Sequence, residues 1–158
     1  MEGERFFKKN IYMRLLENKI VLITGGGRGI GRVIARQFAQ DGATVYVNDL
    51  QIGDMEEWTV EYSNRYGVKI VPICFDVTDS TSLKTGLISI YKAEGHIDCV
   101  VNNAAIIVNQ KLGMVTKHLL EKMYDVNVFA VIDMIQIASR LMARTGGGNF
   151  VNIASITG

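Results

Sequence analysis

A glycine-rich segment has the composition of a phosphate-binding loop. It reads Thr24-Gly25-Gly26-Gly27-Arg28-Gly29-Ile30-Gly31, after an apolar run and before an amphipathic one. Glycines permit a tight turn and a close approach to a pyrophosphate, and a helix that begins there offers free N–H groups and a partial positive charge. Turns are often glycine-rich, so the prediction depends on the position of the loop between a strand and a helix. The predicted dinucleotide-binding residues are Thr24, Gly25, Gly27, Arg28, Gly29, Ile30 and Gly31.

An acidic residue follows the next apolar run. Asp49 lies eighteen positions after Gly31. A carboxylate at the end of the second strand can accept hydrogen bonds from the adenosine ribose hydroxyls and repels a 2′-phosphate, which favours NAD over NADP. Arg28 has the opposite effect, because a cation in the loop can bind that phosphate, so NADP stays open. The alternative interpretation of Asp49 is a solvated loop acid.

The elements that must position these residues alternate along the chain. Apolar, β-rich runs are followed by amphipathic stretches, and the strands are continuously apolar, as expected when helices cover both faces. This pattern predicts an α/β fold, a doubly wound parallel sheet of the Rossmann type with strand order 3-2-1-4-5 and Pro72 on its edge strand. The expected strands are 20–24, 44–47, 69–75, 97–101 and 149–153, and the expected helices are 29–41, 54–66, 80–94 and 117–143.

One domain is expected. Residues 1–14 are polar and charged and are predicted to form a disordered tail, with Met13 as an alternative start; residues 15–158 are predicted to form the dinucleotide-binding domain. In the first helix, the apolar face is predicted to be Ile30, Val33, Ile34 and Phe38.

The helix 117–143 is apolar on two sides. One predicted stripe is Met123, Asn127, Ala130, Met134, Ile137 and Leu141, and the other is Leu120, Tyr124, Val128, Val131, Ile135 and Met142. A helix that is apolar on two sides must be covered on two sides. One stripe can cover the sheet, and the other predicts a homo-oligomer through this helix. The alternative is that it packs on a segment outside this chain.

Composition excludes several other classes. The net charge of +1 gives no reason to expect nucleic-acid binding. No membrane-spanning segment is predicted, because the apolar runs are interpreted as too short to cross a bilayer. Cys74 and Cys99 lie in apolar runs and are interpreted as buried reduced thiols, which favours a cytoplasmic location. His96 and His118 have no cluster of potential ligands around them in the sequence, so no metal site is predicted and both are interpreted as surface residues.

Four further motifs accompany the loop. Asp76-Val77 follows the third strand, Asn102-Asn103-Ala104-Ala105 follows the fourth, Asn127 lies in the long helix, and Ser155 ends Val151-Asn152-Ile153-Ala154-Ser155. Together with the TGxxxGxG spacing, this series resembles the short-chain dehydrogenase/reductase family over about residues 15–158. The resemblance implies adenine contacts by Asp76 and Val77, and cofactor contacts by Asn103, Ala104 and Ala105. It implies catalytic roles for Asn127, in a proton relay, and for Ser155.

Both catalytic candidates have a plainer interpretation. Ser155 can be a hydroxyl that caps backbone at a strand end, and Asn127 can be a buried amide that satisfies backbone groups. Ala105 departs from the glycine usual in the family, a variant that resembles polyol-oxidising members. Strand 149–153 is expected to form an apolar edge that promotes self-association.

The larger departure is in the catalytic pair. None of the six tyrosines has a lysine four positions later, so the family's Tyr-x-x-x-Lys is absent. The chain is therefore expected to be C-terminally truncated and to lack the final strands and helices of the family. Two functions stay open. One is an NAD(P)-dependent oxidoreductase that interconverts a secondary alcohol, such as a polyol or small diol, and a ketone; the other is an inactive nucleotide-binding fragment or isoform.

Overall fold

The computed structural model describes residues 14–108, 110–111 and 113–155. Its strands are β1 (Ile20–Thr24), β2 (Thr44–Asp49), β3 (Ile70–Cys74), β4 (Cys99–Asn102) and β5 (Asn149–Asn152). Its helices are α1 (Gly29–Gln40), α2 (Met55–Tyr66), α3 (Ser80–Glu94), α4 (Lys117–Tyr124), the π-helix η1 (Asp125–Phe129), α5 (Ala130–Met142) and the 3-10 turn η2 (Ala143–Thr145). The predicted tail lies outside the described residues except for Arg14, which donates to the Tyr66 carbonyl at 2.8 Å.

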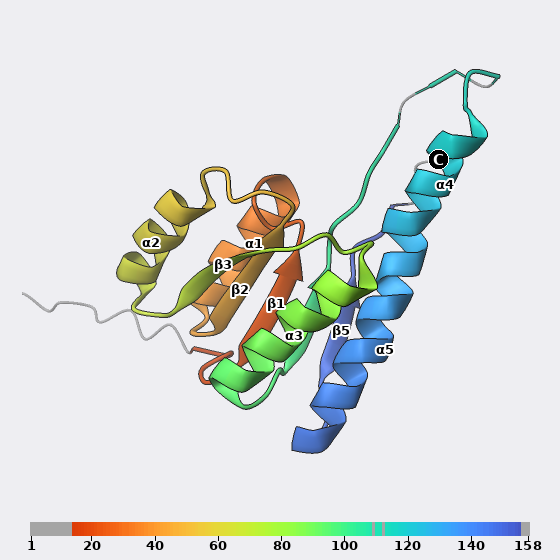
Figure 1. Cartoon of the computed structure of the whole chain (residues 1–158). Helices are drawn as coiled ribbons and strands as arrows, with labels where there is room; N and C mark the ends of the chain where they lie inside the picture. The colour runs from red at the N-terminus through yellow and green to blue at the C-terminus, as the bar shows by residue number, and fades with distance from the viewer. Residues whose placement is uncertain (1–13, 109, 112, 156–158) are drawn as a thin grey trace, which may run out of the picture.

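All strand pairs are parallel, and the order is β3-β2-β1-β4-β5, as predicted. Pro72 lies opposite Val47 in β3, the edge strand, where its missing N–H costs no ladder hydrogen bond on the outer side. Parallel strands end at one edge of the sheet, so the segments after β1, β2 and β3 meet there. Figure 1 shows α4 projecting beyond this carboxyl edge.

Helices cover both faces of the sheet (Figure 1). The helices α1 and α2 pack on one face around Val21, Ile23, Val45 and Val47. On the other face, α3 and α5 pack around Leu22 and Val100. The apolar character of successive strand residues follows from this double cover.

The predicted inner face of α1 is wrong in part, because Ile34 and Phe38 pack against the core but Ile30 and Val33 do not. Ile30 and Val33 are 65% and 60% exposed, and the buried residues are Gly31, Ala35 and Ala39. Small residues allow this helix to approach the sheet closely, and the large apolar side chains are placed on its flanks. Ile30 thereby becomes available at the carboxyl edge.

Helix α3 has the predicted bounds and is capped at both ends. The Asp79 carboxylate accepts from the N–H groups of Thr81 and Ser82, and Gly95 ends the helix in the left-handed region. Other boundaries differ by one or two residues, and β2 continues to Asp49 because its last residues still pair with β3.

The long helix is interrupted, which the sequence did not indicate. A π-helical turn separates α4 from α5, so residues beyond it rotate relative to those before it. The buried residues of α5 are Ala130, Met134, Ala138 and Met142. The first predicted stripe is confirmed in α5, where Ala130 and Met134 are buried and Ile137 and Leu141 pack against the core. The second stripe is wrong at Met142, which belongs to the side that covers the sheet.

By length and composition the helical segment Lys117–Thr145 could cross a membrane, with a mean hydropathy of 1.5 in its most apolar window. The sequence prediction of no such stretch therefore needs correction. A single helix of this kind is weak support for a span, because helices that pack on a core have the same composition. Met134 and Met142 do pack on the sheet.

Both cysteines are free, but neither is fully buried as predicted. Cys74 is exposed and Cys99 is half-buried. Partial burial raises the pKa of both thiols, so both favour the protonated form. His96 lies at the surface, as predicted, and its Nε2 atom lies 3.1 Å from Asp98 Oδ2; Asp98 also forms an ion pair with Lys19.

A polar cluster joins β2, β3 and the end of α3. The Tyr46 hydroxyl donates to Glu94 Oε1 at 2.6 Å, and Lys69 Nζ donates to the same oxygen at 2.5 Å. These two donors lower the pKa of Glu94, whereas burial and the neighbouring Glu94 raise that of Tyr46. The cluster therefore favours an ionised Glu94 beside a neutral tyrosine.

Replacing Glu94 by glutamine is expected to lower the free energy of unfolding by about 1–2 kcal/mol at pH 7, because a charged acceptor of two hydrogen bonds is lost. A depressed carboxyl pKa stabilises the fold above the unfolded pKa, and this stabilisation is lost as pH falls below about 4.3. Urea unfolding at two chosen conditions, pH 7 and about pH 3.5, measures this loss of stability. The difference in the free energy of unfolding between wild type and E94Q should be smaller at pH 3.5, a condition chosen for the test, than at pH 7. The control is E121Q, in the exposed Lys117–Glu121 pair, which should change the free energy of unfolding little.

Candidate functional site

A cavity of about 550 Å³ opens at the carboxyl edge of the sheet. The segments after β1, β2, β3 and β4 form its walls together with residues of α4 and η1. Of the predicted cofactor-binding residues, the lining includes Gly25, Arg28, Ile30, Asp49, Asp76, Val77, Asn103, Ala104 and Ala105. Fold topology thus gathers side chains from four separate motifs around one space.

The loop after β1 is bonded to the loop after β4. The Thr24 hydroxyl accepts from the N–H groups of Asn103 and Ala104, each at 3.1 Å. The Asn103 amide donates to the carbonyls of Thr24 at 3.0 Å and Gly25 at 2.8 Å. Thr24 is buried, so its position supports the loop from below the cavity.

Two loop glycines are required by close packing. A Cβ at Gly31 would lie 2.4 Å from the Gly25 carbonyl oxygen, and one at Gly25 would lie 2.7 Å from Ala104 Cα. Gly29 differs, because a Cβ there would meet nothing within 4 Å. Its φ of +54° is instead the left-handed conformation that favours glycine.

The start of α1 fits an anionic ligand. No side chain caps this helix, and its first turn carries no acidic residue. Its free N–H groups and partial positive charge therefore stay available to a ligand such as a pyrophosphate. The glycines beside it leave room for that ligand, so the residues present fit the phosphates of a dinucleotide.

Asp49 lies against the phosphate loop. Its Oδ2 atom accepts from the Gly27 N–H at 3.1 Å, and its Oδ1 atom accepts from the Leu50 N–H at 2.8 Å. Each carboxylate oxygen keeps a second lone pair for a ligand hydroxyl. On the far wall, Asp76 Oδ1 accepts from the N–H and hydroxyl of Thr78, at 2.8 and 2.7 Å, which fixes this turn.

Sequence reasoning missed eight residues that line the cavity: Asn48, Leu50, Phe75, Thr78, Ile106, Lys122, Asp125 and Val126. A large apolar residue directly after the strand-end acid was a signal for Leu50. Ile106 follows the Asn-Asn-Ala-Ala motif and was therefore also accessible from the pattern. Lys122 comes from the long helix, and only the fold brings it to this edge.

Asn127 joins the long helix to the loop after β4. Its Oδ1 atom accepts from the Ile106 N–H, and its Nδ2 atom donates to the Ile106 carbonyl, both at 2.9 Å. The residue lies in the π-helical turn η1. It satisfies the backbone groups of Ile106, as the plainer interpretation held; Ile106 lines the cavity, and Asn127 itself does not.

Ser155 lies beyond the end of β5 and does not line the cavity. The ends of β4 and β5 are joined just before it, where Asn102 Nδ2 donates to Asn152 Oδ1 at 2.9 Å and the Ile153 N–H donates to the Asn102 carbonyl at 2.9 Å. Among the described residues, no group of three or more histidine, cysteine or acidic side chains is arranged to hold a metal ion.

Replacing Asn127 by alanine is expected to destabilise the chain by about 2 kcal/mol, because two hydrogen bonds are lost and the backbone groups of Ile106 lose their partners. Amide hydrogen exchange should become faster at Ile106 and its neighbours. Ser139→Ala is the control, since the Ser139 hydroxyl bonds only the carbonyl of Gln136 within its own helix. Unchanged exchange at Ile106 in the Asn127 variant would contradict the bridging role.

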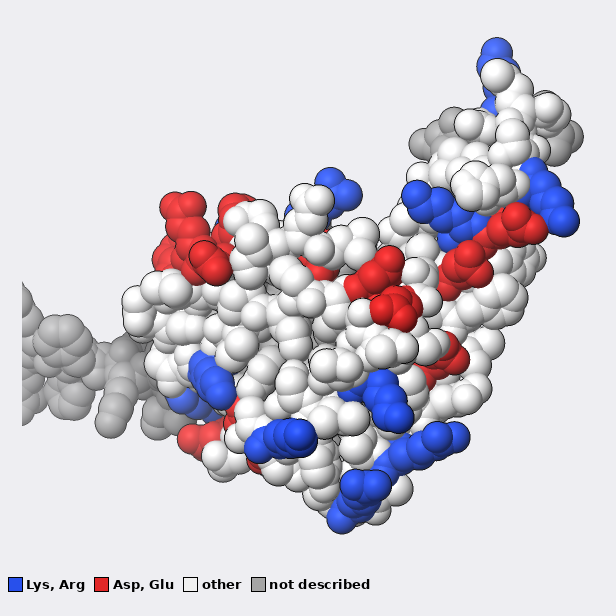
Figure 2. Space-filling model, in the orientation of Figure 1, with Lys and Arg blue, Asp and Glu red and all other residues white. Residues whose placement is uncertain are grey.

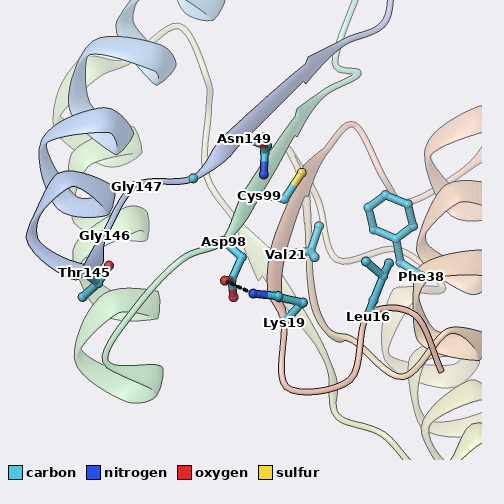
Figure 3. Close-up of a pocket in the computed structure, with 11 residues that line it drawn as sticks. Leu16, Lys19, Val21, Phe38, Asp98, Cys99, Thr145, Gly146, Gly147 and Asn149 are labelled. Atoms are coloured by element: carbon cyan, nitrogen blue, oxygen red, sulfur yellow. Dashed lines mark hydrogen bonds and ion pairs between the residues drawn. The ribbon is translucent and has the colours of Figure 1, made fainter.

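A second cavity, of about 450 Å³, lies at the opposite edge of the sheet (Figure 3). Lys19, Asp98 and Asn149 mark the strand starts around it, and Figure 3 shows the ion pair of Lys19 with Asp98. It contains none of the predicted site residues. The chemistry of the phosphate loop is therefore confined to the carboxyl edge.

The fold and the cavity at its carboxyl edge define a dinucleotide-binding α/β protein of the Rossmann type. Comparison with known families narrows this class: the model for short chain dehydrogenases matches residues 19–158. The chain belongs to the short-chain dehydrogenase family.

Two curated relatives are sugar-alcohol and diol enzymes by name. Galactitol 2-dehydrogenase of Agrobacterium fabrum is 33% identical over 144 residues, which are 90% of this chain and 55% of that protein. L-2,3-butanediol dehydrogenase of Corynebacterium glutamicum is 36% identical over 141 residues, 88% of this chain and 55% of that protein. The chain thus spans about half the length of the curated relatives that it matches.

Solved structures share the architecture. The NADPH-dependent 3-quinuclidinone reductase of Rhodotorula rubra superposes with a TM-score of 0.84 at 26% identity, over 99% of this chain and 59% of that one. An NAD+-bound xylitol dehydrogenase also gives 0.84, at 24% identity over 90% of this chain and 55% of that one, which is a likeness of fold alone. By their names, the first of these enzymes depends on NADPH and the second is bound to NAD+, so the shared fold does not fix the cofactor.

Proposed function

We propose that this chain binds NAD(H) at the carboxyl edge of its sheet and forms the cofactor-binding part of an oxidoreductase that interconverts a secondary alcohol and a ketone. The observation that carries the proposal is the uncapped start of α1, which adjoins the cavity lined by Gly25, Arg28 and Ile30. An N-terminus of this kind is a site for the phosphates of a dinucleotide. When bound, NAD supplies the hydride acceptor or donor.

In this proposal each segment of the site has its own part. The backbone of Gly27–Gly31 binds the pyrophosphate, while Asp49 holds the adenosine ribose, and Asp76 and Val77 border the adenine. The segment Asn103–Ala105 supports the nicotinamide half. Asn127 positions the loop after β4 through its two bonds to Ile106.

Ser155 is proposed to orient the alcohol or carbonyl group of the substrate, because it follows β5 at the same edge. Proton transfer requires an acid/base residue in addition. No Tyr-x-x-x-Lys occurs in these 158 residues. The second candidate function, nucleotide binding without turnover, is favoured by this feature of the chain as given.

The choice of NAD over NADP rests on the position of Asp49 beside the loop. The polyol or small-diol substrate class is proposed from the names of the galactitol and butanediol relatives and from Ala105. We also propose a homo-oligomer through the exposed apolar side of α4 and α5, and a cytoplasmic location, with which free cysteines agree.

Titration of the 158-residue chain with NADH tests the proposal. Saturable binding is expected by NADH fluorescence, with no turnover of galactitol or 2,3-butanediol, because the proton-transfer pair is absent. The variant G31A should bind NADH about tenfold more weakly or worse, because the new Cβ would displace the loop. G53A controls for a general loss of fold, because a Cβ at Gly53, a glycine of positive φ, would meet nothing within 4 Å. Absence of saturable NADH binding to the folded chain would refute the cofactor site.

A further inference from the structure

A groove of about 950 Å³ lies between α3 and α5, on the side of these helices that faces away from the sheet. Its apolar floor consists of Ile88 and Tyr91 from α3 and of Ile137 and Leu141 from α5, all half-buried. No residue that lines the cofactor cavity lines this groove. It is therefore a separate feature of the surface.

Four cations surround the apolar floor. Lys84 and Lys92 come from α3, Arg140 comes from α5, and Arg144 comes from the turn that follows it. All four are exposed, and within the described residues none lies within 4.0 Å of a carboxylate. Since the whole chain has a net charge of only +1, these charges are concentrated locally. Figure 2 shows basic side chains gathered over the lower parts of α3 and α5, with uncharged surface between them.

Two acidic side chains, Asp133 and Glu94, lie on these helices, and each has another partner. Asp133 accepts from the Ser80 hydroxyl, at the start of α3. Glu94, at the end of α3, pairs with Lys69. Neither carboxylate forms an ion pair with any of the four cations, so the groove offers apolar contact and unpaired basic side chains together.

The groove does not arise from the open edge of the sheet. The helices α3 and α5 pack together over β1 and β4, two strands that each have a neighbour on both sides. A further strand would have to join at β5 or β3, away from the floor of this groove. Its shape is therefore a property of the described elements themselves.

We propose that this groove binds a single-chain amphiphilic anion, a carboxylate with a medium or long alkyl chain. The alkyl chain lies on the floor, where burial of apolar surface provides the attraction. The carboxylate is bound by the guanidinium groups of Arg140 and Arg144, whose planar donors match two carboxylate oxygens. The lysines of α3 add long-range attraction. This site is independent of the proposed cofactor function.

The experiment uses dansyl-undecanoate, kept below its micelle concentration, as a fluorescent probe of the 158-residue chain. Saturable binding is expected, with displacement by decanoate and little displacement by the uncharged decanol. The double variant R140Q/R144Q should weaken binding by about tenfold, because two charge-assisted contacts are lost. The variant I137S should also weaken binding of the probe, because it removes apolar surface from the floor of the groove. The matched control K111Q/K117Q removes two exposed lysines outside the groove and should leave binding unchanged.

Circular dichroism and NADH titration of each variant show whether the fold and the cofactor site are intact. Equal binding by wild type and R140Q/R144Q would overturn the proposal, as would equal displacement by decanol and decanoate. Binding only to micelles or to anionic vesicles, without binding of the monomeric probe, would also overturn it and would indicate a membrane-facing surface instead. If the wild-type chain binds the probe but does not bind NADH, the proposed cofactor site is refuted and the proposed groove site is not.

Discussion

Replacing Asp49 by serine is expected to reverse the proposed preference of this chain for NADH over NADPH. The carboxylate accepts from the Gly27 N–H, so it lies beside the loop proposed to bind the pyrophosphate. A 2′-phosphate on the ribose would approach this charge closely, and repulsion at about 4 Å costs on the order of 1–4 kcal/mol. Removing the charge relieves that cost for NADPH and also removes an acceptor for the ribose hydroxyls of NADH. Together these effects predict a change of about a hundredfold in the ratio of the two dissociation constants.

Two further variants test whether the charge of Asp49 sets the cofactor preference. D49N keeps an oxygen that accepts from Gly27 and removes only the charge, so it should recover NADPH binding with a smaller loss for NADH. D54N removes an exposed acid that pairs with Arg32, and it should leave both affinities unchanged. Fluorescence titration with both cofactors provides the measurement. Tighter binding of NADPH than of NADH by the wild-type chain would show that Arg28 dominates over Asp49.

Replacing both Phe129 and Ile132 by lysine is expected to weaken self-association of the chain by about a hundredfold or more. An apolar surface on the outer side of the long helix includes Leu120, Tyr124, Phe129 and Ile132, which are 45–56% exposed. Burial of a phenylalanine or isoleucine side chain contributes about 1.5–3 kcal/mol, and two charges at the interface add repulsion. Size exclusion with light scattering over a concentration series gives the dissociation constant.

The choice of positions depends on the structure. Met134 is apolar and lies in the same helix, but it is 1% exposed against the sheet, so a charge there would unfold the chain. V33K/V60K is the matched control, because it changes two exposed apolar residues on α1 and α2 by the same chemistry. Association that persists in F129K/I132K would assign it to the open edge of β5, where Val151 is exposed, and would contradict the helix interface.

Several features of the site were available from local sequence. The glycines of the loop, Asp49 and the Asn-Asn-Ala-Ala segment all lie directly after apolar runs, and a parallel sheet brings such positions to one edge. Order and spacing were therefore sufficient to predict that these residues share a cavity. The cap at Asp79 and the ends of α3 were predictable for a similar reason, because capping depends on a few adjacent residues.

Features that depend on packing were predicted less well. The apolar periodicity of α1 favoured Ile30 and Val33 as its inner face, but close approach to the sheet selects Gly31, Ala35 and Ala39 instead. Periodicity reports which residues are apolar and not how near the helix lies to its partner.

The sequence by itself determined the α/β class, the strand order and the set of motifs that meet at the carboxyl edge, because each follows from local pattern and chain order. Only the tertiary structure decided which side of the long helix is buried. The π-helical turn at Asn127, fixed by two hydrogen bonds to Ile106, shifts the helix by one residue and reassigns its faces. The groove between α3 and α5 also appears only in the fold, because its floor and its cations come from segments about fifty residues apart in the chain.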